Sequence, residues 1–351
     1  MGNVKTSERV RVLMTGAGAP GGPGIIQCLK ADSRIELVVG DTNPKASGRF
    51  LNDKFVELRA ADDNLYIQHL LSICNDEKID VIFPLVTKEL LKISMAVSEF
   101  DSIGVKVLIS PRNGLDISND KIKLYRHLES NKIPVPRFKV ASNLKQLIEA
   151  AESLGYPEVP IVMKPGISNG SRGIRILDEK KDRFSLLFQE KPTGIFSTLS
   201  EVIQIIDKNN IPPLLVSEYL PGNEVTVDTI LTKDHRIACL LQRVRDKMNG
   251  GISVAGHFIE NPKIKKYIED ILGTMKLFGP IGIQIKEDST GEYRILEINP
   301  RIQGTSVAAN GLGINLPITA ISALFDWPIP KKNIKKNIGF VRYYTEAYYD
   351  Y

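Results

Sequence analysis

The chain has 351 residues, of which 42% are hydrophobic, and a formal net charge of +5 from 46 basic and 41 acidic side chains. This length predicts two or three domains, and the ordinary composition argues against a disordered or repetitive protein. The basic residues are densest at 330–337, which we interpret as a solvated loop. Elsewhere they are spread along the sequence and do not predict the concentrated basic face of a nucleic-acid-binding protein. We therefore expect no nucleic-acid partner.

The cysteines, the histidines and the N-terminus exclude further classes. Three widely spaced cysteines without a C-x-x-C pair argue against a disulfide framework, and neither they nor the four scattered histidines have the spacing of a zinc site. The chain starts without an apolar signal segment and has no run of eighteen apolar residues. We expect a cytoplasmic protein with no membrane partner.

Apolar strands alternate with amphipathic helices over the first third of the chain. This order predicts a parallel sheet with helices on both faces, that is, an α/β Rossmann-like domain, which we place at residues 1–112. The expected strands are Val10–Thr15, Ile35–Gly40, Val81–Val86 and Val105–Ser110, and the expected helices are Gly24–Ala31, Leu65–Asn75 and Lys88–Phe100.

A glycine-rich stretch, TGAGAPGGPG, overlaps the end of the first expected strand and continues beyond it. Gly16, Gly18 and Gly21 fit the G-x-G-x-x-G pattern of dinucleotide-binding proteins, and Asp41 lies twenty residues further on, where an acid would bind ribose. A nicotinamide-dependent dehydrogenase is therefore one hypothesis. Pro23 suits the first turn of a helix whose free N–H groups can bind an anion, so the loop is alternatively one wall of a substrate site, with Asp41 as a substrate contact or, preferably, a turn residue. The residues assigned to that wall are Gly18, Ala19, Pro20 and Gly21.

Alternating rather than solidly apolar strands predict an antiparallel arrangement, and therefore an α+β region, over the remaining residues, about 240 in number. We expect Ser118 or Asn119 to cap a helix that ends near Ser130, and a further helix at Leu144–Leu154. The aromatic end, GFVRYYTEAYYDY, predicts a strand and an exposed tail that serves packing, a dimer contact or a partner site, with packing favoured.

The stretch MKPGISNGSRGI places Lys164 at the end of a strand, directly before the glycine- and serine-rich loop Ser168–Gly173. Such a loop exposes backbone N–H groups that can approach phosphates closely. It is not a Walker A loop, because the lysine precedes the glycines and a strand rather than a helix follows. A plain surface hairpin is an equally good interpretation of this stretch taken alone.

The stretch SEYLPGNEVTVD ends one strand at Glu218, Tyr219 and Leu220 and starts another after a turn. The backbone there can offer an N–H and a C=O to an adenine, and Glu224 can accept the hydroxyl groups of a ribose. Glu224, Thr226 and Asp228 share one strand face, which is alternatively a solvated acidic face.

The stretch IGIQIKEDSTGEYRILEINPR predicts a hairpin. If Ser289–Glu292 form a four-residue loop, Gln284 lies opposite Glu297, and Asn299 and Arg301 continue the same parity. Amide and carboxylate oxygens of this kind suit Mg²⁺ that bridges nucleotide phosphates, and an arginine next to them can clamp an acyl phosphate or a carboxylate.

Taken together, these motifs resemble the ATP-grasp superfamily, and most closely its carbamoyl-phosphate-synthetase-type members, over nearly the whole chain. The resemblance implies a Rossmann-like domain followed by two subdomains that clamp ATP, which we place at 113–215, with the glycine-rich flap, and at 216–351, with the metal site. It implies catalytic roles for Arg301, Arg243 (with Arg245 as the alternative) and Lys164, and metal ligation by Gln284, Glu297 and Asn299. The implied nucleotide-binding residues are Lys121, Lys164, Ser168, Asn169, Gly170, Ser171, Gly173, Glu218, Tyr219, Leu220 and Glu224.

The resemblance also implies a reaction. ATP, with Mg²⁺ or Mn²⁺, would convert a carboxylate into an acyl phosphate, which an amine or another nucleophile then attacks to release phosphate. Gly304, Thr305 and Ser306 are expected to line the acceptor site, or else to cap a helix. The chain is about one synthetase half without a recognisable glutaminase, so carbamoyl-phosphate chemistry is the alternative, followed by the dehydrogenase and by a non-catalytic nucleotide-binding protein. The expected partners are small-molecule carboxylates and amines, and a homodimer is expected only by analogy.

Overall fold

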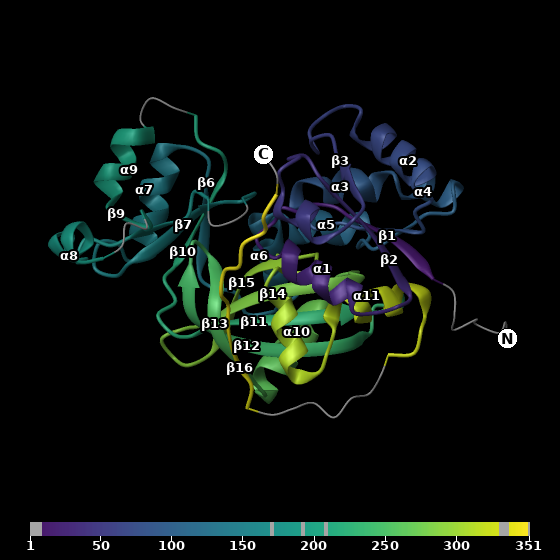
Figure 1. Cartoon of the computed structure of the whole chain (residues 1–351). Coiled ribbons are helices and arrows are strands. Elements are labelled where there is room, and N and C mark those ends of the chain that lie inside the picture. Colours follow the sequence, from purple (N-terminus) through teal and green to yellow (C-terminus); the bar gives the residue numbers. More distant parts are fainter. Residues whose placement is uncertain (1–8, 169–171, 191–193, 207–209, 330–336, 350–351) are drawn as a thin grey trace.

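Figure 1 shows the computed structural model, which describes residues 9–168, 172–190, 194–206, 210–329 and 337–349. Within these residues the strands form three sheets: a parallel sheet in the first third, a smaller sheet that projects to one side, and a six-stranded sheet in the C-terminal part. No single described helix is long and apolar enough to cross a membrane. The 3₁₀ helix η2 (Ser306–Leu312) and helix α11 (Leu316–Phe325) pass that test only as a pair bent by 98°, and α11 lies buried in the core.

The first sheet is parallel throughout, in the order β3-β2-β1-β4-β5, which confirms the predicted α/β fold class of this part. Strand β3 was not predicted, because its three residues are too few to show a period. The expected helix Lys88–Phe100 is instead two helices that meet at Ala96. The elements are β1 (Val10–Met14), α1 (Gly22–Lys30), β2 (Ile35–Asp41), a 3₁₀ helix at Ser47–Leu51, β3 (Phe55–Glu57), α2 (Tyr66–Asp76), β4 (Val81–Phe83), α3 (Thr87–Met95), α4 (Val97–Ser102) and β5 (Lys106–Val107).

Two helices connect this domain to the rest of the chain, α5 (Arg112–Ser118) and α6 (Lys121–Ser130). The predicted cap of α6 was wrong: Ser118 ends α5, and Asp120 caps α6 with a carboxylate oxygen that accepts hydrogen bonds from the backbone N–H groups of Ile122 (2.9 Å) and Lys123 (3.2 Å). A carboxylate at this position satisfies free N–H groups and favours the positive end of the helix dipole. The cap therefore fixes Lys121 at the first position of the helix.

The second sheet has the order β6-β10-β7-β8-β9, and only β8 and β9 run parallel in it. It forms, with its helices, the part that projects to the left in Figure 1. Its elements are β6 (Phe138–Ala141), α7 (Leu144–Ser153), β7 (Ile161–Pro165), β8 (Arg175–Leu177), α8 (Arg183–Phe188), β9 (Phe196–Ser197), α9 (Leu199–Ile206) and β10 (Leu214–Glu218).

The third sheet is antiparallel, in the order β15-β14-β11-β12-β13-β16. The antiparallel character expected of the α+β region is confirmed in this sheet. Its elements are β11 (Glu224–Leu231), β12 (Ile237–Asn249), β13 (Ile252–Ile259), α10 (Pro262–Gly273), β14 (Gly279–Glu287), β15 (Tyr293–Asn299) and β16 (Gly339–Val341).

The hairpin of β14 and β15 pairs Gln284 with Glu297, as predicted. The path to that pairing differs from the prediction, because five residues rather than four separate the strands and the register shifts between Gln284 and Ile285. Ile285 pairs with Ile295, so Leu296 is an extra residue that forms a bulge. The longer loop and the bulge offset each other, which leaves the predicted pair intact.

The first domain and the third sheet share one hydrophobic core, which joins Val12, Ile26 and Ile321 of β1, α1 and α11. The two parts approach each other closely at Gly21 and Gly304, since a Cβ built on Gly21 would lie 2.0 Å from the Cα of Gly304. The two segments assigned to the acceptor site are therefore in backbone contact. Only glycine at position 21 allows this contact.

We predict that Gly21→Ala lowers the free energy of unfolding by about 1–3 kcal/mol, because the new methyl group would overlap the Gly304 backbone. Gly273→Ala is the matched control, since a Cβ there meets nothing within 4 Å. Chemical denaturation of both variants checks this expectation. Equal stability of the two variants would contradict it.

Candidate functional site

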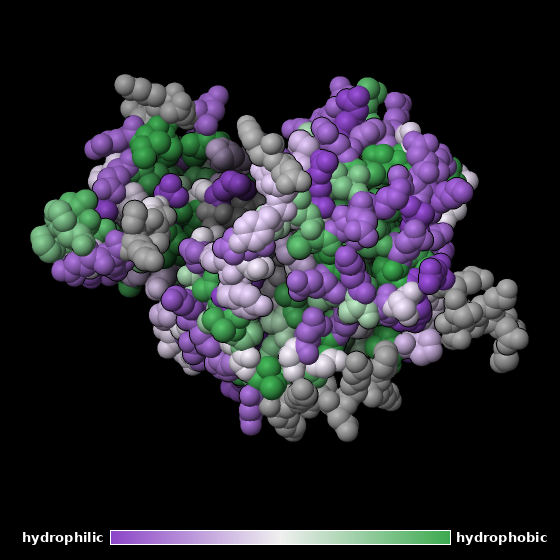
Figure 2. All heavy atoms as spheres, viewed as in Figure 1, coloured by the Kyte–Doolittle hydropathy of each residue, from purple (hydrophilic) through white to green (hydrophobic). Residues whose placement is uncertain are grey.

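One face of the third sheet brings together the polar residues singled out in the sequence. Register pairs Glu297 with Gln284, Gln284 with Thr226, and Thr226 with Arg243, so these four residues lie side by side on β15, β14, β11 and β12. A recess with much hydrophilic surface separates the second sheet from the rest of the molecule (Figure 2). Lys121 and Lys164, one on α6 and the other on β7, both reach residues of β15.

The two lysines are buried, and each keeps only 5% of its surface exposed. The Lys121 ammonium lies 3.3 Å from a carboxylate oxygen of Glu297 and donates a hydrogen bond to the carbonyl of Ser168 at 3.0 Å. The Lys164 ammonium donates to the carbonyl of Leu296 at 3.1 Å and to the hydroxyl of Tyr125 at 3.5 Å. Burial, together with the charge of Lys121, lowers the pKa of Lys164 to about 8. The site therefore holds two buried ammonium groups, with Glu297 paired to Lys121 and with Glu297 and Glu224 both near Lys164.

The three expected metal ligands present oxygen atoms, the donors that Mg²⁺ prefers. Burial alone would raise the pKa of Glu297, but the charge of Lys121 and a hydrogen bond from the Asn299 amide (2.9 Å) hold that pKa below its usual value. Gln284 accepts a hydrogen bond from Arg245 at 3.2 Å. Cationic side chains thus contact Glu297 and Gln284 at the atoms that a metal ion would bind.

The arginines of β12 lie on this buried face. Arg243 is 1% exposed and forms an ion pair with Asp228, which is 4% exposed, at 2.8 Å. Its Nη1 atom has no hydrogen-bond partner among the described residues. Arg245 pairs with Glu224 and also donates to the carbonyl of Gly251 at 2.6 Å. The alternative of a solvated acidic face was therefore wrong, because Asp228 is buried, Glu224 is partly buried, and both are paired with arginines.

The expected adenine hinge lies where β10 leaves the second sheet. Glu218 accepts hydrogen bonds from the backbone N–H (2.8 Å) and the guanidinium (2.7 Å) of Arg137. The Lys286 ammonium lies 4.9 Å from the centre of the Tyr219 ring, and Leu220 is buried. Lys286 pairs in register with Glu224, so hinge and expected ribose acid are neighbours.

The structure directs Arg301 toward the first domain. Its Nε atom donates to the hydroxyl of Thr87, the first residue of α3, at 3.0 Å, and its Nη1 atom donates to the carbonyl of Ile302 at 2.9 Å. The acidic groups near it are Glu297 and Glu89. Arg301 therefore joins the C-terminal end of β15 to the end of the parallel sheet.

The glycine-rich stretch of the first domain uses Asp41 for its own conformation. One carboxylate oxygen of Asp41 accepts from the backbone N–H of Gly18 (2.7 Å) and the other from that of Asn43 (2.9 Å). This is the turn role that the sequence favoured over a ribose contact. Of the expected flap, Ser168 contacts Lys121 and Gly173 has a left-handed backbone (φ 76°). The expected flap residues Asn169, Gly170 and Ser171 lie outside the described residues.

Three residues at this site were missed. Tyr125 lies under Lys164 and donates to the carbonyl of Ile295 at 2.7 Å. Gln303 packs over Gly282, where a Cβ would lie 1.7 Å from its amide nitrogen, and Arg342 donates to the carbonyl of Pro20 at 2.8 Å. The parity that links Glu297, Asn299 and Arg301 continues to Gln303, so that signal was present in the sequence.

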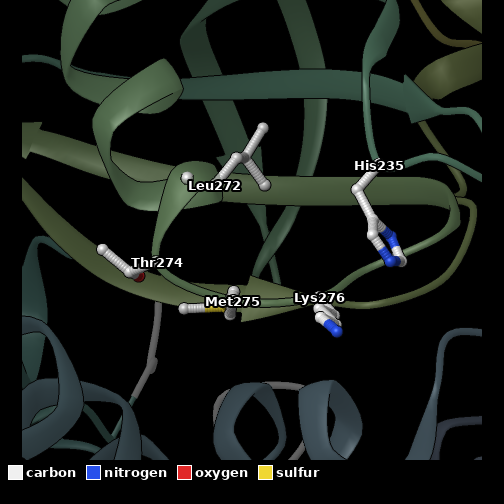
Figure 3. A pocket seen from close by; sticks show the side chains of 6 residues that line it. His235, Leu272, Thr274, Met275 and Lys276 are labelled. Carbon is white, nitrogen blue, oxygen red and sulfur yellow. The ribbon is translucent and has the colours of Figure 1, made fainter.

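A separate hollow lies between the β11–β12 turn and the end of α10, lined by His235, Leu272, Gly273, Thr274, Met275 and Lys276 (Figure 3). The His235 ring contacts the carbonyl of Leu277 at 2.7 Å. None of the site residues that the structure describes lines this hollow.

Comparisons with known proteins bear on this site. Residues 210–346 match the family described as "ATP-grasp in the biosynthetic pathway with Ter operon", and residues 12–108 match "PylC-like, N-terminal domain". Residues 210–346 thus match an ATP-grasp domain. The chain's ATP-grasp fold is similar to that of N5-carboxyaminoimidazole ribonucleotide synthetase in an ADP complex (TM-score 0.71, 16% identity, 95% of this chain and 81% of the other). It is also similar to that of biotin carboxylase from Campylobacter jejuni (TM-score 0.68, 15% identity, 95% and 74%).

The curated proteins to which this chain is similar include carbamoyl phosphate synthase large chains. One from Clostridium botulinum (strain Kyoto / Type A2) is 25% identical over 325 residues, which are 86% of this chain and 28% of the relative. One from Pseudothermotoga lettingae is 24% identical over 303 residues, which are 82% and 25%. The chain thus spans only about a quarter of the length of these relatives.

We predict that Asp228→Asn lowers the free energy of unfolding by about 3–5 kcal/mol, because it leaves the Arg243 guanidinium buried without its counter-charge. Adding Arg243→Gln to this variant should reduce the loss, since the unpaired charge is then gone. Urea denaturation measures both effects.

The matched control for this prediction is Glu269→Gln, which removes an exposed acid from a pair with Lys265 and should change stability by less than about 1 kcal/mol. The expectation is wrong if Asp228→Asn costs no more than this surface change.

Proposed function

We propose that this chain is an ATP- and Mg²⁺-dependent ligase that activates a carboxylate as an acyl phosphate and joins it to an amine or another nucleophile. The observation that carries the proposal is the buried pair of Lys121 and Lys164 beside the carboxylate of Glu297. Ammonium groups that are 5% exposed, and of which only Lys121 forms an ion pair, are suited to bind a polyanion such as a nucleotide polyphosphate. The names of the relatives and of the structural neighbours, which are ligases and carboxylases, agree with this class of reaction.

Gln284, Glu297 and Asn299 would hold Mg²⁺ or Mn²⁺, because their oxygens match the preference of these ions and because cations already contact two of them. The ion, when bound, supplies charge neutralisation to the nucleotide phosphates. Lys121 and Arg245 would then exchange their present acidic or amide partners for phosphate oxygens. The donor set contains one acid and two amides, which is why no cluster of three acidic, His or Cys ligands occurs in the described part of the chain.

The chain's own residues would act mainly by position and charge. Lys121 and Lys164 would bind phosphate oxygens, and Arg243 and Arg301 would stabilise the negative charge on the transferring group, since phosphoryl transfer needs orientation and neutralisation more than covalent help. The flap that starts at Ser168 would exclude water, so that the acyl phosphate meets the nucleophile first. Glu218, Tyr219 and Leu220 would hold the adenine and Glu224 the ribose.

The remaining parts of the proposal concern the substrates. The contact of Gly18–Gly21 with Gly304–Ser306 supports a shared wall for the carboxylate and amine substrates. Carbamoyl-phosphate-type chemistry is the second candidate, favoured by the relatives, although the chain spans a quarter of their length. A dehydrogenase is disfavoured, because the Asp41 carboxylate is occupied by Gly18 and Asn43. We further propose that the chain is divided into the units 1–112, 113–215 and 216–351. The proposal also includes a cytoplasmic location and a homodimer.

The test of this function is a screen of amino acids and small carboxylates for ADP release in the presence of Mg²⁺ and hydroxylamine. We expect ADP to form only with the correct acid and to be matched by a hydroxamate, because hydroxylamine traps an acyl phosphate. ADP release without any hydroxamate would contradict the ligase mechanism. Binding of NADH at micromolar concentration without binding of ATP would favour the dehydrogenase instead.

The lowered pKa of Lys164 predicts a pH dependence of nucleotide binding. Its pKa is about 8 in the free protein and should rise when a polyphosphate binds, so binding above pH 8 takes up a proton and the affinity falls as the pH rises. Calorimetric titration with ADP should show binding about tenfold weaker at pH 9.5 than at pH 8.5. Lys164→Gln should bind more weakly at every pH but without this trend, and a flat wild-type profile from pH 7 to 9.5 would refute the expectation.

A further inference from the structure

The end of the chain forms a strap, residues Gly339–Tyr349, that joins the edge of the third sheet to the first domain. After β16, Arg342 donates its backbone N–H to the carbonyl of Val254 at 2.7 Å and its guanidinium to the carbonyl of Pro20 at 2.8 Å. Further on, the ring of Tyr349 stacks on that of Phe50 with centres 4.7 Å apart. Figure 1 shows this segment rising from β16 between the second sheet and the first domain. The strap therefore borders the glycine-rich stretch that is proposed as a substrate wall.

Strand register places Arg342 on the same sheet face as Arg243. Arg243 pairs with Phe258, and Phe340 pairs with Gly256, two residues before Phe258 on β13, so Phe340 and Arg342 continue the parity of Phe258. Gly256 leaves the space that the Phe340 ring fills, because a Cβ there would lie 2.8 Å from that ring. The face that carries the candidate site thus extends across β13 to β16.

This end of the face carries more positive than negative charge. Arg243 uses its Nε atom for Asp228, and its buried Nη1 atom has no hydrogen-bond partner within the described ranges. The side-chain partner of Arg342 is a neutral carbonyl, that of Pro20. Burial and the nearby charge of Arg243 lower the pKa of Arg342. The two neighbouring guanidinium groups therefore carry two positive charges, of which only that of Arg243 is paired with a carboxylate, that of Asp228. The remaining positive charge favours an anion.

The position of this charge separates it from the nucleotide lysines. Lys121 and Lys164 contact Glu297 and Leu296 on β15, whereas Arg342 follows β16, and these strands are the two edges of the sheet. Five strand spacings of about 4.8 Å place the two edge strands roughly 24 Å apart. We therefore expect an anion at Arg342 to be distinct from a phosphate held by the two lysines.

We propose that Arg342, which lies next to Arg243, binds an anionic group of the acceptor substrate, a carboxylate or a phosphate, and so determines specificity for an acidic acceptor. This inference rests on the proposed function, since it assumes that the nucleotide occupies the lysine end of the site. Arg342 belongs to the strap and contacts the glycine-rich stretch at Pro20, so the residue that recognises the acceptor would also fix the wall beside it. The acceptor class implied is a nucleophile with an acidic group, such as an amino acid.

The test uses the full chain saturated with a non-hydrolysable ATP analogue and Mg²⁺, titrated by calorimetry with inorganic phosphate and, separately, with acetate. The wild-type protein should bind at least one of these probes, and the probe that binds identifies the acidic group as phosphate or carboxylate. Arg342→Gln should weaken that binding at least about tenfold, as expected for loss of a charge-assisted hydrogen bond. The affinity of Arg342→Lys for the probe should lie between those of the wild-type and Arg342→Gln proteins. The affinity for the ATP analogue should stay within about twofold.

Arg236→Gln is the matched control, because it removes an arginine that is 82% exposed and distant in the fold from the strap. If the ATP analogue binds but the probe binds equally well to the wild-type and Arg342→Gln proteins, or to neither, the inference is overturned and the proposed function is not. Failure of the analogue to bind the wild-type protein would instead overturn the proposed function, and the inference with it. The two failures are therefore distinguishable.

Discussion

Burial of positive charge on one face of the third sheet is the constraint on which the site depends. A charge removed from water costs several kcal/mol unless it is paired, and an incomplete set of partners leaves part of that cost in place. Arg243 and Asp228 offset each other almost fully, whereas Glu297 serves Lys121 and also lies near Lys164. The enclosed cations outnumber the enclosed acids, which makes an anionic ligand part of the charge balance of the folded chain. The cations are Lys121, Lys164, Arg243, Arg245 and Arg301, and the acids are Glu224, Asp228, Glu297 and, near Arg301, Glu89.

The three sheets are held together at this face by contacts that span the sequence. Lys121 and Lys164 come from α6 and from the second sheet and meet at β15, so the second sheet is tied to the third by charge and hydrogen bonds. The first domain is tied to the third sheet by the backbone contact of Gly21 with Gly304 and by the hydrogen bond of Arg301 with Thr87. Apolar packing of α11 against α1 and β1 supplies the larger burial. Movement of either flanking part would therefore alter the same set of charges.

Local periodicity predicted most helices and strands of the first domain and one central pair of the third sheet, and it failed where long-range contacts decide. The pairing of Gln284 with Glu297 was predicted from parity and an assumed four-residue loop; the loop has five residues, and the bulge at Leu296 that restores the pair leaves no signal in the sequence. Whether Glu224 and Asp228 face solvent depends on arginines that β12 supplies across the sheet, and strand alternation cannot distinguish an enclosed acidic face from an exposed one. The contact between Arg301 and Thr87 joins residues 214 positions apart, which no local pattern encodes. The roles of these residues toward ligands stay predictions.

The pairings in the free protein bear on how strongly a ligand can bind. Arg245 holds Glu224, and Lys121 holds Glu297, so a nucleotide with its metal ion would exchange partners for these groups rather than create new ion pairs in an empty space. The binding free energy is then a difference between two sets of paired charges, and it is smaller than a sum over the new contacts would suggest. The same exchange offers specificity, because a ligand that supplies only the anion would leave Glu297 without a cation. Anion and metal ion are therefore expected to bind together, since each completes the pairing that the other disrupts.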